Sequence, residues 1–269
     1  MENGFYLYCI RPHTDVAIEV SRTISGKGEI LAIPFLELEA LTSEVSLDEF
    51  GSDEIRKKAE EDLDWIKMKA QVHEEVVEQA MREGDSISIP VIPMQFGVIF
   101  RTKEKLLESM YLNLERFRDN LGFIKGRQEW GIKAFLDQKA FDEIIENANE
   151  EIQAKKREAE LLPKGMAFFA KKQAASKIEE IKDNELSRIT IEIKDNLARL
   201  AVSLHKAKIL EKDFTRMTHD MVFNVFCLVD QSELDEFKAV THEMKEKYLP
   251  FGIEIEMSGP WPSYHFAIA

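Results

Sequence analysis

The stretch from Asp137 to about Leu210 constrains the fold most, because its residues have helical character almost throughout. A break is predicted only around Pro163. After it, apolar residues recur mostly at steps of three and four along one stripe: Ile178, Ile181, Leu186, Ile189, Ile193, Leu197, Leu200 and Leu204. An amphipathic helix of this length can pack on a sheet for only part of its course. We expect the remainder to pack on another helix or another molecule.

Segments typical of β-strands flank this helical stretch. Residues 129–136, EWGIKAFL, alternate in polarity, and residues 221–230, MVFNVFCLVD, are apolar on both faces, as in a central strand. A helix is predicted from Ser232, then a strand at FGIEIEMS and a last strand at YHFAIA. This order predicts an α+β, ferredoxin-like C-terminal domain over residues 121–269, with a long helical insertion at about 137–210.

The first half of the chain predicts a separate N-terminal α+β sheet domain over residues 1–120. FYLYCI at 5–10 and the run at 30–45 predict three short strands, the second and third divided near Pro34. A single helix is predicted from Ser52 to Arg82, with a buried stripe of Ile55, Ala59, Leu63, Ile66, Ala70, His73, Val77 and Ala80. An extended run, SISIPVIPMQFGVIF, follows it, and a further helix is predicted from Thr102 to about Asn120.

Charge and hydropathy exclude several classes of partner. Acidic residues outnumber basic ones, 50 against 36, so the formal net charge is −14 and nucleic acid is disfavoured. The longest apolar run, IPVIPMQFGVIF, is too short to span a bilayer, so we expect no contact with a lipid membrane. The first residues, MENGFYLYCIRPH, lack a basic region followed by an apolar one, so we expect no secretion signal. Cys9 and Cys227 lie in apolar runs, and we expect buried reduced thiols and a cytoplasmic protein.

No motif for catalysis, metal binding or a cofactor is present. GKG at 26–28 lacks the rest of a phosphate-binding loop, and the six histidines are scattered, which leaves a metal site only as a minor alternative. Adjacent carboxylates point to different sides of a helix and do not converge as an acid and a base. His73 lies on the apolar stripe of its helix. We expect a neutral imidazole that hydrogen-bonds a sheet carbonyl or a carboxylate, the alternatives being a pH switch or a ligand contact.

Aromatic residues form the more informative set. Phe96 and Phe100 flank Gly97, and a glycine beside bulky rings lets another backbone approach closely. Core packing is the simpler explanation, and an apolar docking surface for a protein is the functional alternative. Trp130 alternates with polar neighbours on the strand that opens the second half.

The C-terminal run GPWPSYHFAIA is apolar and stiff where chains usually fray. Gly259 permits a tight turn, and the two prolines beside Trp261, Pro260 and Pro262, favour extended backbone. We therefore expect Tyr264, Phe266 and Ile268 to enter the core as a closing strand.

Four segments in order, GFYLYCI, VHEEVVEQAM running into VIPMQFGVIF, EWGIKAF and GPWPSYHFA, resemble the gas vesicle accessory protein family F/L. The resemblance extends from the first strand to the end of the chain. Ser263 and His265 depart from the family's common GPWPPYSF. These segments do not separate the F branch from the L branch.

The resemblance implies a non-enzymatic, minor gas vesicle component with a two-domain α+β architecture. Its implied partners are the small, very hydrophobic shell protein, bound through the N-terminal domain, and other vesicle accessory proteins. It implies synthesis in the cytoplasm and then location at the gas vesicle. An acidic protein that covers apolar surface and sheet edges of shell subunits would prevent their aggregation. We hypothesise that Phe96, Phe100 and the edge of the N-terminal sheet make this contact.

Two other function classes stay open at this point. Ferredoxin-like domains often bind ligands between subunits, so a ligand-sensing regulatory module is the main alternative. An enzyme with a site built from dispersed residues is the other. The sequence does not define the oligomeric state.

Overall fold

The computed structural model describes residues 2–267 except 19, 21, 162–163 and 213–216. Its contacts divide the chain into two compact units, Met1–Glu129 with Pro260–Ala269, and Trp130–Gly259. The boundary predicted near residue 121 therefore differs from the observed division. The chain passes from one unit to the other twice, and its C-terminal end, predicted as part of the second half, belongs to the first unit.

The first unit contains a five-stranded sheet with the order β2-β3-β1-β6, in which β7 also pairs with β1. Strands β1, β2 and β3 are antiparallel neighbours. The elements of this unit are β1 (Asn3–Pro12), β2 (Leu31–Phe35), β3 (Leu38–Ser46), α1 (Leu47–Phe50), α2 (Ser52–Glu61), α3 (Leu63–Ala80), β4 (Arg82–Glu83), β5 (Ser86–Ile87), β6 (Ile92–Pro93), β7 (Ile99–Phe100), α4 (Lys103–Leu112) and α5 (Leu114–Ile124).

The three predicted N-terminal strands are present, and the second and third are divided near Pro34 as predicted. The turn lies at Leu36, whose φ is 53°, and Pro34 lies within β2. Since β2 is at one end of the sheet order, its proline does not interrupt a central ladder.

Helix α3 packs on the sheet through its C-terminal half. Its buried residues are Lys69, Val72, His73, Val76, Val77 and Ala80, and the apolar ones join a core with Tyr6, Tyr8 and Leu41. Helix α5 contacts β1 and β6, and α4 contacts β7. Together α4 and α5 bury Leu106, Met110, Phe117, Leu121 and Ile124.

The prediction of one helix from Ser52 to Arg82 is wrong. Asp62 adopts φ −140° and ψ 78°, and its side chain accepts a hydrogen bond from the amide of Trp65 at 2.9 Å, so that it ends α2 and caps α3. The predicted stripe fails at the same place, because Leu63 is 63% exposed and Ala70 is exposed. The helix predicted from Thr102 is likewise interrupted, at Asn113.

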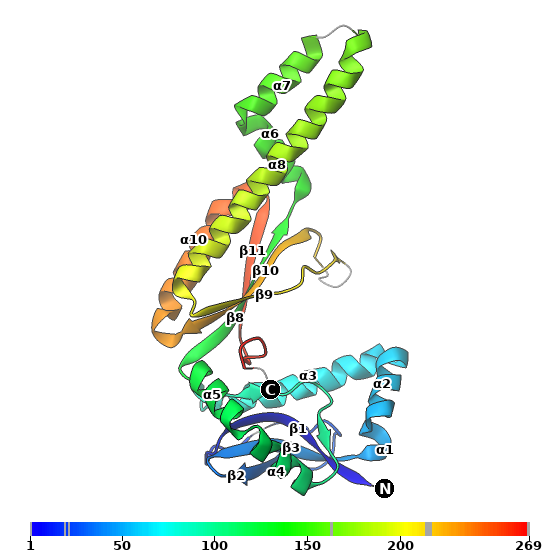
Figure 1. Cartoon of the computed structure of the whole chain (residues 1–269), viewed down its shortest axis with the longest axis vertical. Coiled ribbons are helices and arrows are strands. Elements are labelled where there is room, and N and C mark those ends of the chain that lie inside the picture. Colours follow the sequence, from blue (N-terminus) through cyan, green and yellow to red (C-terminus); the bar gives the residue numbers. More distant parts are fainter. Residues whose placement is uncertain (1, 19, 21, 162–163, 213–216, 268–269) are drawn as a thin grey trace. The chain divides into compact units, whose positions relative to one another are not determined.

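The second unit contains a four-stranded sheet with the order β11-β8-β10-β9. Its helices α8 and α10 pack on the sheet (Figure 1). Its elements are β8 (Arg127–Leu136), which begins in the first unit, α6 (Gln138–Ala148), α7 (Glu150–Leu161), α8 (Lys164–Leu200), β9 (Ser203–Lys206), β10 (Asp220–Asp230), the 3-10 turns η1 (Gln231–Glu233) and η2 (Leu249–Phe251), α10 (Leu234–Tyr248), and β11 (Ile253–Trp261).

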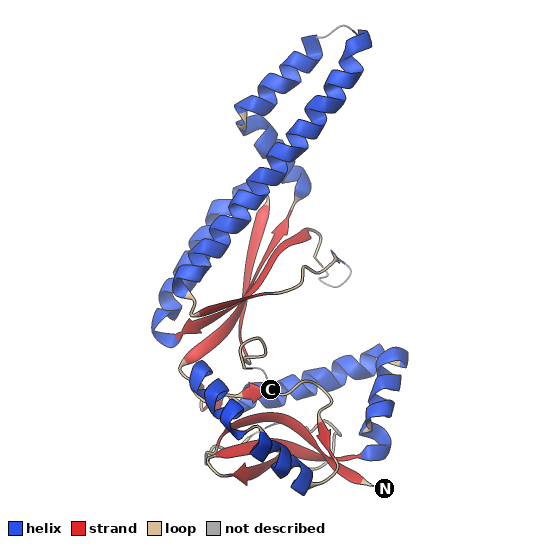
Figure 2. Cartoon of the chain, viewed as in Figure 1, coloured by secondary structure: helices blue, strands red, loops and turns tan. Residues whose placement is uncertain are grey.

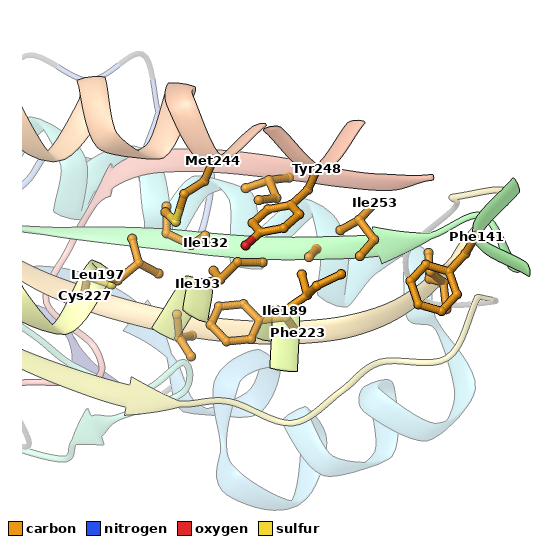
Figure 3. Packing of buried hydrophobic residues seen from close by; sticks show 14 of the residues in the cluster. Ile132, Phe141, Ile189, Ile193, Leu197, Phe223, Cys227, Met244, Tyr248 and Ile253 are labelled. Atoms are coloured by element: carbon orange, nitrogen blue, oxygen red, sulfur yellow. The ribbon is translucent and has the colours of Figure 1, made fainter. Parts of the chain in front are cut away.

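The apolar stripe predicted along the long helix lies in the hydrophobic core of this unit. Ile189, Ile193 and Leu197 of α8 are fully buried against side chains of the sheet and of α10, such as Phe223 and Tyr248 (Figure 3). The part of α8 that extends beyond the sheet lies alongside α7, and α6 also contacts α8 (Figure 2). The expectation that one part packs on a sheet and another on a helix is confirmed.

Three predictions about the second half are wrong. The helix ends at Leu200, so Leu204 lies in β9 instead of the helical stripe. The helix predicted from Ser232 begins at Leu234, after a 3-10 turn. The final strand is not formed by Tyr264 and Phe266, because β11 continues through Gly259 and Pro260 and the chain then turns. The break predicted around Pro163, and Ile268, fall outside the described residues.

Both cysteines are buried free thiols, as the sequence predicted. Among the described residues, none of the helices has the length and apolar character needed to cross a bilayer.

Candidate functional site

The segment from Ile92 to Phe100, which contains the predicted docking residues, lies along the outer edge of β1. Strand β6 pairs with Cys9 and Ile10, and β7 pairs with Phe5 and Tyr6. Between these pairs, the Met94 amide donates to the Tyr8 carbonyl and the Leu7 amide donates to the Val98 carbonyl, both at 2.9 Å. The backbone of β1 therefore has hydrogen-bond partners on this side over most of its length.

A buried tyrosine and histidine fix the bend in this segment. His73 Nδ1 lies 2.9 Å from the Tyr6 hydroxyl, and its Nε2 lies 3.1 Å from the Met94 carbonyl oxygen. The Gly97 amide donates to the Tyr6 hydroxyl at 3.2 Å. Burial lowers the pKa of His73 to about 4, so the imidazole is neutral at pH 7. It then donates through Nε2 to Met94 and accepts from Tyr6 through Nδ1, which matches the structural role predicted for it.

Gly97 is needed for its backbone angle. Its φ is +90°, a conformation that side-chain-bearing residues rarely adopt. A Cβ built at this position would lie 3.6 Å from Ile55, an ordinary contact, so the predicted close approach of a backbone is not found at Gly97. The close approach is at Gly4, where a Cβ would lie 3.0 Å from the Phe100 carbonyl oxygen.

The two phenylalanines occupy different environments. The Phe96 ring packs on the core, with ring centroids 6.1 Å from Tyr6 and 6.3 Å from His73. Phe100 lies on β7 opposite Phe5 and is half-buried. Substitution of Phe96 therefore perturbs the core, whereas Phe100 is the better probe of a surface contact.

The C-terminal motif is held by two carboxylates of the first unit. The Tyr264 hydroxyl donates to Glu74 Oε2 at 2.8 Å. His265 binds Glu129 twice, through its amide at 3.1 Å and through Nδ1 at 2.6 Å. Glu129 is 1% exposed, and burial raises the pKa of Glu74 while its hydrogen bond from Tyr264 opposes that shift.

This anchoring replaces the predicted closing strand. The amides of Phe266 and Ala267 donate to the Ser263 carbonyl, which forms one tight turn after the buried Pro262. Phe266 is only half-buried. Side-chain hydrogen bonds, rather than a strand ladder, determine the path of this segment.

Trp130, the residue after Glu129 in the sequence, lies in the core of the second unit. It is 7% exposed, and Lys238 Nζ lies 5.0 Å from its ring centroid, a cation–π contact. The structure thus gathers His73, Phe96 and Gly97 in one place, sets Phe100 on the adjoining β7 strand, and joins Tyr264 by a hydrogen bond to Glu74, the residue after His73 on α3.

Sequence reasoning missed a buried ion pair in the first unit. Arg11 and Glu39, each 1% exposed, are 2.7 Å apart, and Arg11 also donates to the carbonyls of Ala80 and Val16. His13 contacts the other oxygen of Glu39 at 2.8 Å. In the sequence, Arg11 directly follows the first predicted strand and Glu39 lies within the run at 30–45, and neither position identifies a partner. Within the ranges described, no cluster of three or more histidine, cysteine or acidic residues could hold a metal ion.

Comparison with known proteins decides the family. The family model "Gas vesicle synthesis protein GvpL/GvpF" matches residues 4–268. The chain belongs to the GvpL/GvpF family of gas vesicle proteins. This membership implicates it in gas vesicle assembly and associates it with the gas vesicle and its proteins.

Relatives with both family names resemble this GvpL/GvpF chain over nearly its whole length. Gas vesicle protein L1 of Halobacterium salinarum is 24% identical, with 99% of this chain and 91% of the relative covered. Gas vesicle protein L of a Streptomyces species is 24% identical over 97% of this chain and 92% of the relative. The crystal structure of GvpF from Anabaena superposes with a TM-score of 0.73 at 20% identity, covering 99% of both chains.

Proposed function

We propose that this chain is a non-enzymatic gas vesicle assembly protein that binds the hydrophobic shell protein and prevents its aggregation before it enters the vesicle wall. The observation that carries the proposal is the family match over residues 4–268. Its net charge of −14 supports the proposal, because like charge keeps complexes with an apolar partner apart in solution.

In this proposal the chain covers the apolar surface of shell subunits before they assemble. A subunit that forms a strand-rich wall exposes apolar side chains and sheet edges before assembly, and these associate without control unless they are covered. We propose that shell subunits are held in this way in the cytoplasm and that the chain then remains with the gas vesicle. Other vesicle accessory proteins are expected partners of the same complex.

We place the shell-protein contact on the first unit around Phe100, Gly97 and Phe96. The backbone of β1 is already paired beside these residues, which argues against addition of a strand there and favours a contact through side chains. Half-burial leaves part of each ring available, and Gly97 fixes the bend between them. This refines the expectation that Phe96, Phe100 and the edge of the N-terminal sheet make the contact together.

Capture of the purified shell protein by the full-length chain tests this site. The full chain is required because the first unit includes the C-terminal residues from Pro260. We expect Phe100→Asp to reduce capture at least ~10-fold, since a carboxylate opposes burial in an apolar contact. Phe96→Asp should reduce capture as well, with some loss of stability.

Leu63→Asp is the matched control. Leu63 is an exposed apolar residue of the first unit, and an aspartate at the first position of α3 suits the helix N-terminus. Its capture should equal that of the unaltered chain. Undiminished capture by Phe100→Asp, with the fold intact by circular dichroism, would rule out this surface.

We further propose that the two units are domains and that the second has a ferredoxin-like fold. Its strands, numbered one to four along the chain from β8, lie in the spatial order four-one-three-two. The α6–α8 segment connects β8 to β9, and α10 connects β10 to β11, as in a split β-α-β-β-α-β arrangement. Limited proteolysis checks the division, because two separate domains predict that Met1–Glu129 and Trp130–Gly259 are each recovered as a protease-resistant fragment.

A further inference from the structure

The edge of the second unit's sheet is incomplete beside the first half of β10. Strand β9 pairs with β10 only from Val225↔Lys206 to Leu228↔Ser203. Before Val225, no described residue pairs with β10 as a strand on this side. The chain after β9 contacts this part of β10 at separate points. The Asn224 carbonyl accepts from the Ala207 amide and the Asn224 side chain donates to the Lys208 carbonyl, the Leu210 amide donates to Met221 Sδ at 3.4 Å, and Lys212 pairs with Asp220. An opening therefore remains between α8 and the start of β10.

This opening is an apolar groove of about 330 Å³. Its apolar lining comes from three elements and the loop after β9: Ile191 of α8, Leu204 of β9, Ile209, and Val222, Phe223 and Val225 of β10. Ile191 is 57% exposed and Ile209 is 41% exposed, so apolar surface faces the groove without being covered. A volume of this size accepts one or two large apolar side chains.

The charges at the groove have a single sign. Its charged lining residues are Lys194 and Lys206, and neither has an ion-pair partner among the residues that the structure describes. The nearby carboxylate of Glu192 is taken by Arg188 and Lys247, and Asp220 is paired with Lys212 at 3.0 Å. In a chain of net charge −14, two unpaired lysines beside exposed apolar side chains form a site complementary to negative charge.

We propose that this groove binds a short segment of a second protein in which large apolar side chains are flanked by carboxylates. The apolar side chains fill the groove between α8 and β10, and the carboxylates pair with Lys194 and Lys206. Exposed ion pairs contribute at most about 1 kcal/mol each, so the apolar contact provides affinity and the lysines provide selectivity. This surface belongs to the second unit and is separate from the contact proposed around Phe100.

Fluorescence anisotropy with two synthetic peptides tests the proposal on the full chain. One labelled peptide has a Leu-Phe-Leu centre flanked by glutamates, and the other has the same centre flanked by lysines. We expect the glutamate peptide to bind about 10-fold more tightly, with the preference shrinking as salt is added. Lys194→Glu combined with Lys206→Glu should reverse the preference, and Ile191→Asp should weaken the binding of both peptides.

The matched control is Lys139→Glu combined with Lys245→Glu, which changes the charge of the same unit equally at exposed positions away from the groove. This variant should keep the preference. Equal binding of the two peptides, or a preference that survives the change at Lys194 and Lys206, overturns the proposal. Binding of decanoate but not of the glutamate peptide would make the groove a fatty-acid site. Dimerisation that is lost in the groove variant would assign the groove to a second copy of the chain. Either result also overturns the proposal.

Discussion

The outer edge of β1 in the first unit and the β9 edge of the sheet in the second unit are completed in different ways. The segment from Ile92 to Phe100 pairs with β1 and is fixed by the hydrogen bonds of Tyr6 and His73. Strand β9 ends at Lys206 and leaves the first half of β10 beside an apolar groove. We call the first edge closed, because its backbone is paired and only side chains are available to a partner. We call the second edge open, because it leaves an apolar groove that a partner can enter.

Loss of a buried polar partner in the first unit should lower the free energy of unfolding most, and the largest decrease is expected for a substitution of Glu39. Glu39→Gln leaves the buried Arg11 guanidinium without a carboxylate, which should lower the free energy of unfolding by about 3–5 kcal/mol. Urea denaturation measures this change. Glu37→Gln, two residues earlier in an exposed pair with Arg118, should leave the free energy of unfolding almost unchanged. Similar values for the two variants would contradict the assignment of Arg11 and Glu39 as a structural anchor.

The closed edge should also make stability depend on pH through His73. Its pKa of about 4 in the folded chain lies below the ordinary value near 6.5, so the folded state resists protonation. The contribution of the neutral His73 to the free energy of unfolding is complete above pH 6.5. It is lost as the pH falls toward 4, and the loss is about 3 kcal/mol at most. The free energy of unfolding, measured across this pH range, should change less with pH for His73→Gln than for the unaltered chain. Parallel profiles for the variant and the unaltered chain would show that His73 does not titrate in this way.

The C-terminal anchor should have a smaller effect. His265→Ala removes the side-chain partner of the buried Glu129 carboxylate and should lower the free energy of unfolding by about 1.5–3 kcal/mol. Tyr264→Phe, which removes one hydrogen bond to Glu74, should lower it by about 1 kcal/mol. Thermal unfolding of both variants shows which of the two substitutions lowers stability more. A larger loss for Tyr264→Phe than for His265→Ala would mean that Glu74 is the principal anchor.

The groove of the second unit should contribute least to stability. Lys194→Glu with Lys206→Glu changes two exposed side chains that lack ion-pair partners among the described residues, so we expect a change within about 0.5 kcal/mol. Differential scanning calorimetry measures it. A loss of several kcal/mol would show that the lysines have a structural role and would remove the contrast between the two edges.

Periodicity located most elements, because burial of one face leaves a regular pattern. Ile189, Ile193 and Leu197 identified the buried face of α8, and the strand pattern around Cys227 identified a central strand. The same reasoning failed at Asp62, because helical spacing continues across the break and only the local cap shows where one helix ends.

Long-range hydrogen bonds were not predictable from the sequence. The alternation of Tyr264, Phe266 and Ile268 imitates a strand, yet the carboxylates that fix this segment come from α3 and β8, far away in the sequence. His73 was predicted to hydrogen-bond a sheet carbonyl or a carboxylate, but its second partner, Tyr6, lies 67 residues away. The groove depends on where β9 ends, and the helical pattern predicted through Leu204 concealed that position.

The most direct test is the aggregation of purified shell protein diluted from denaturant, followed by light scattering with and without the full-length chain. The account predicts that an equimolar amount suppresses scattering and that Phe100→Asp loses most of this suppression while Leu63→Asp retains it. Scattering that is the same with and without the chain would contradict the claim that it covers the apolar surface of the shell protein.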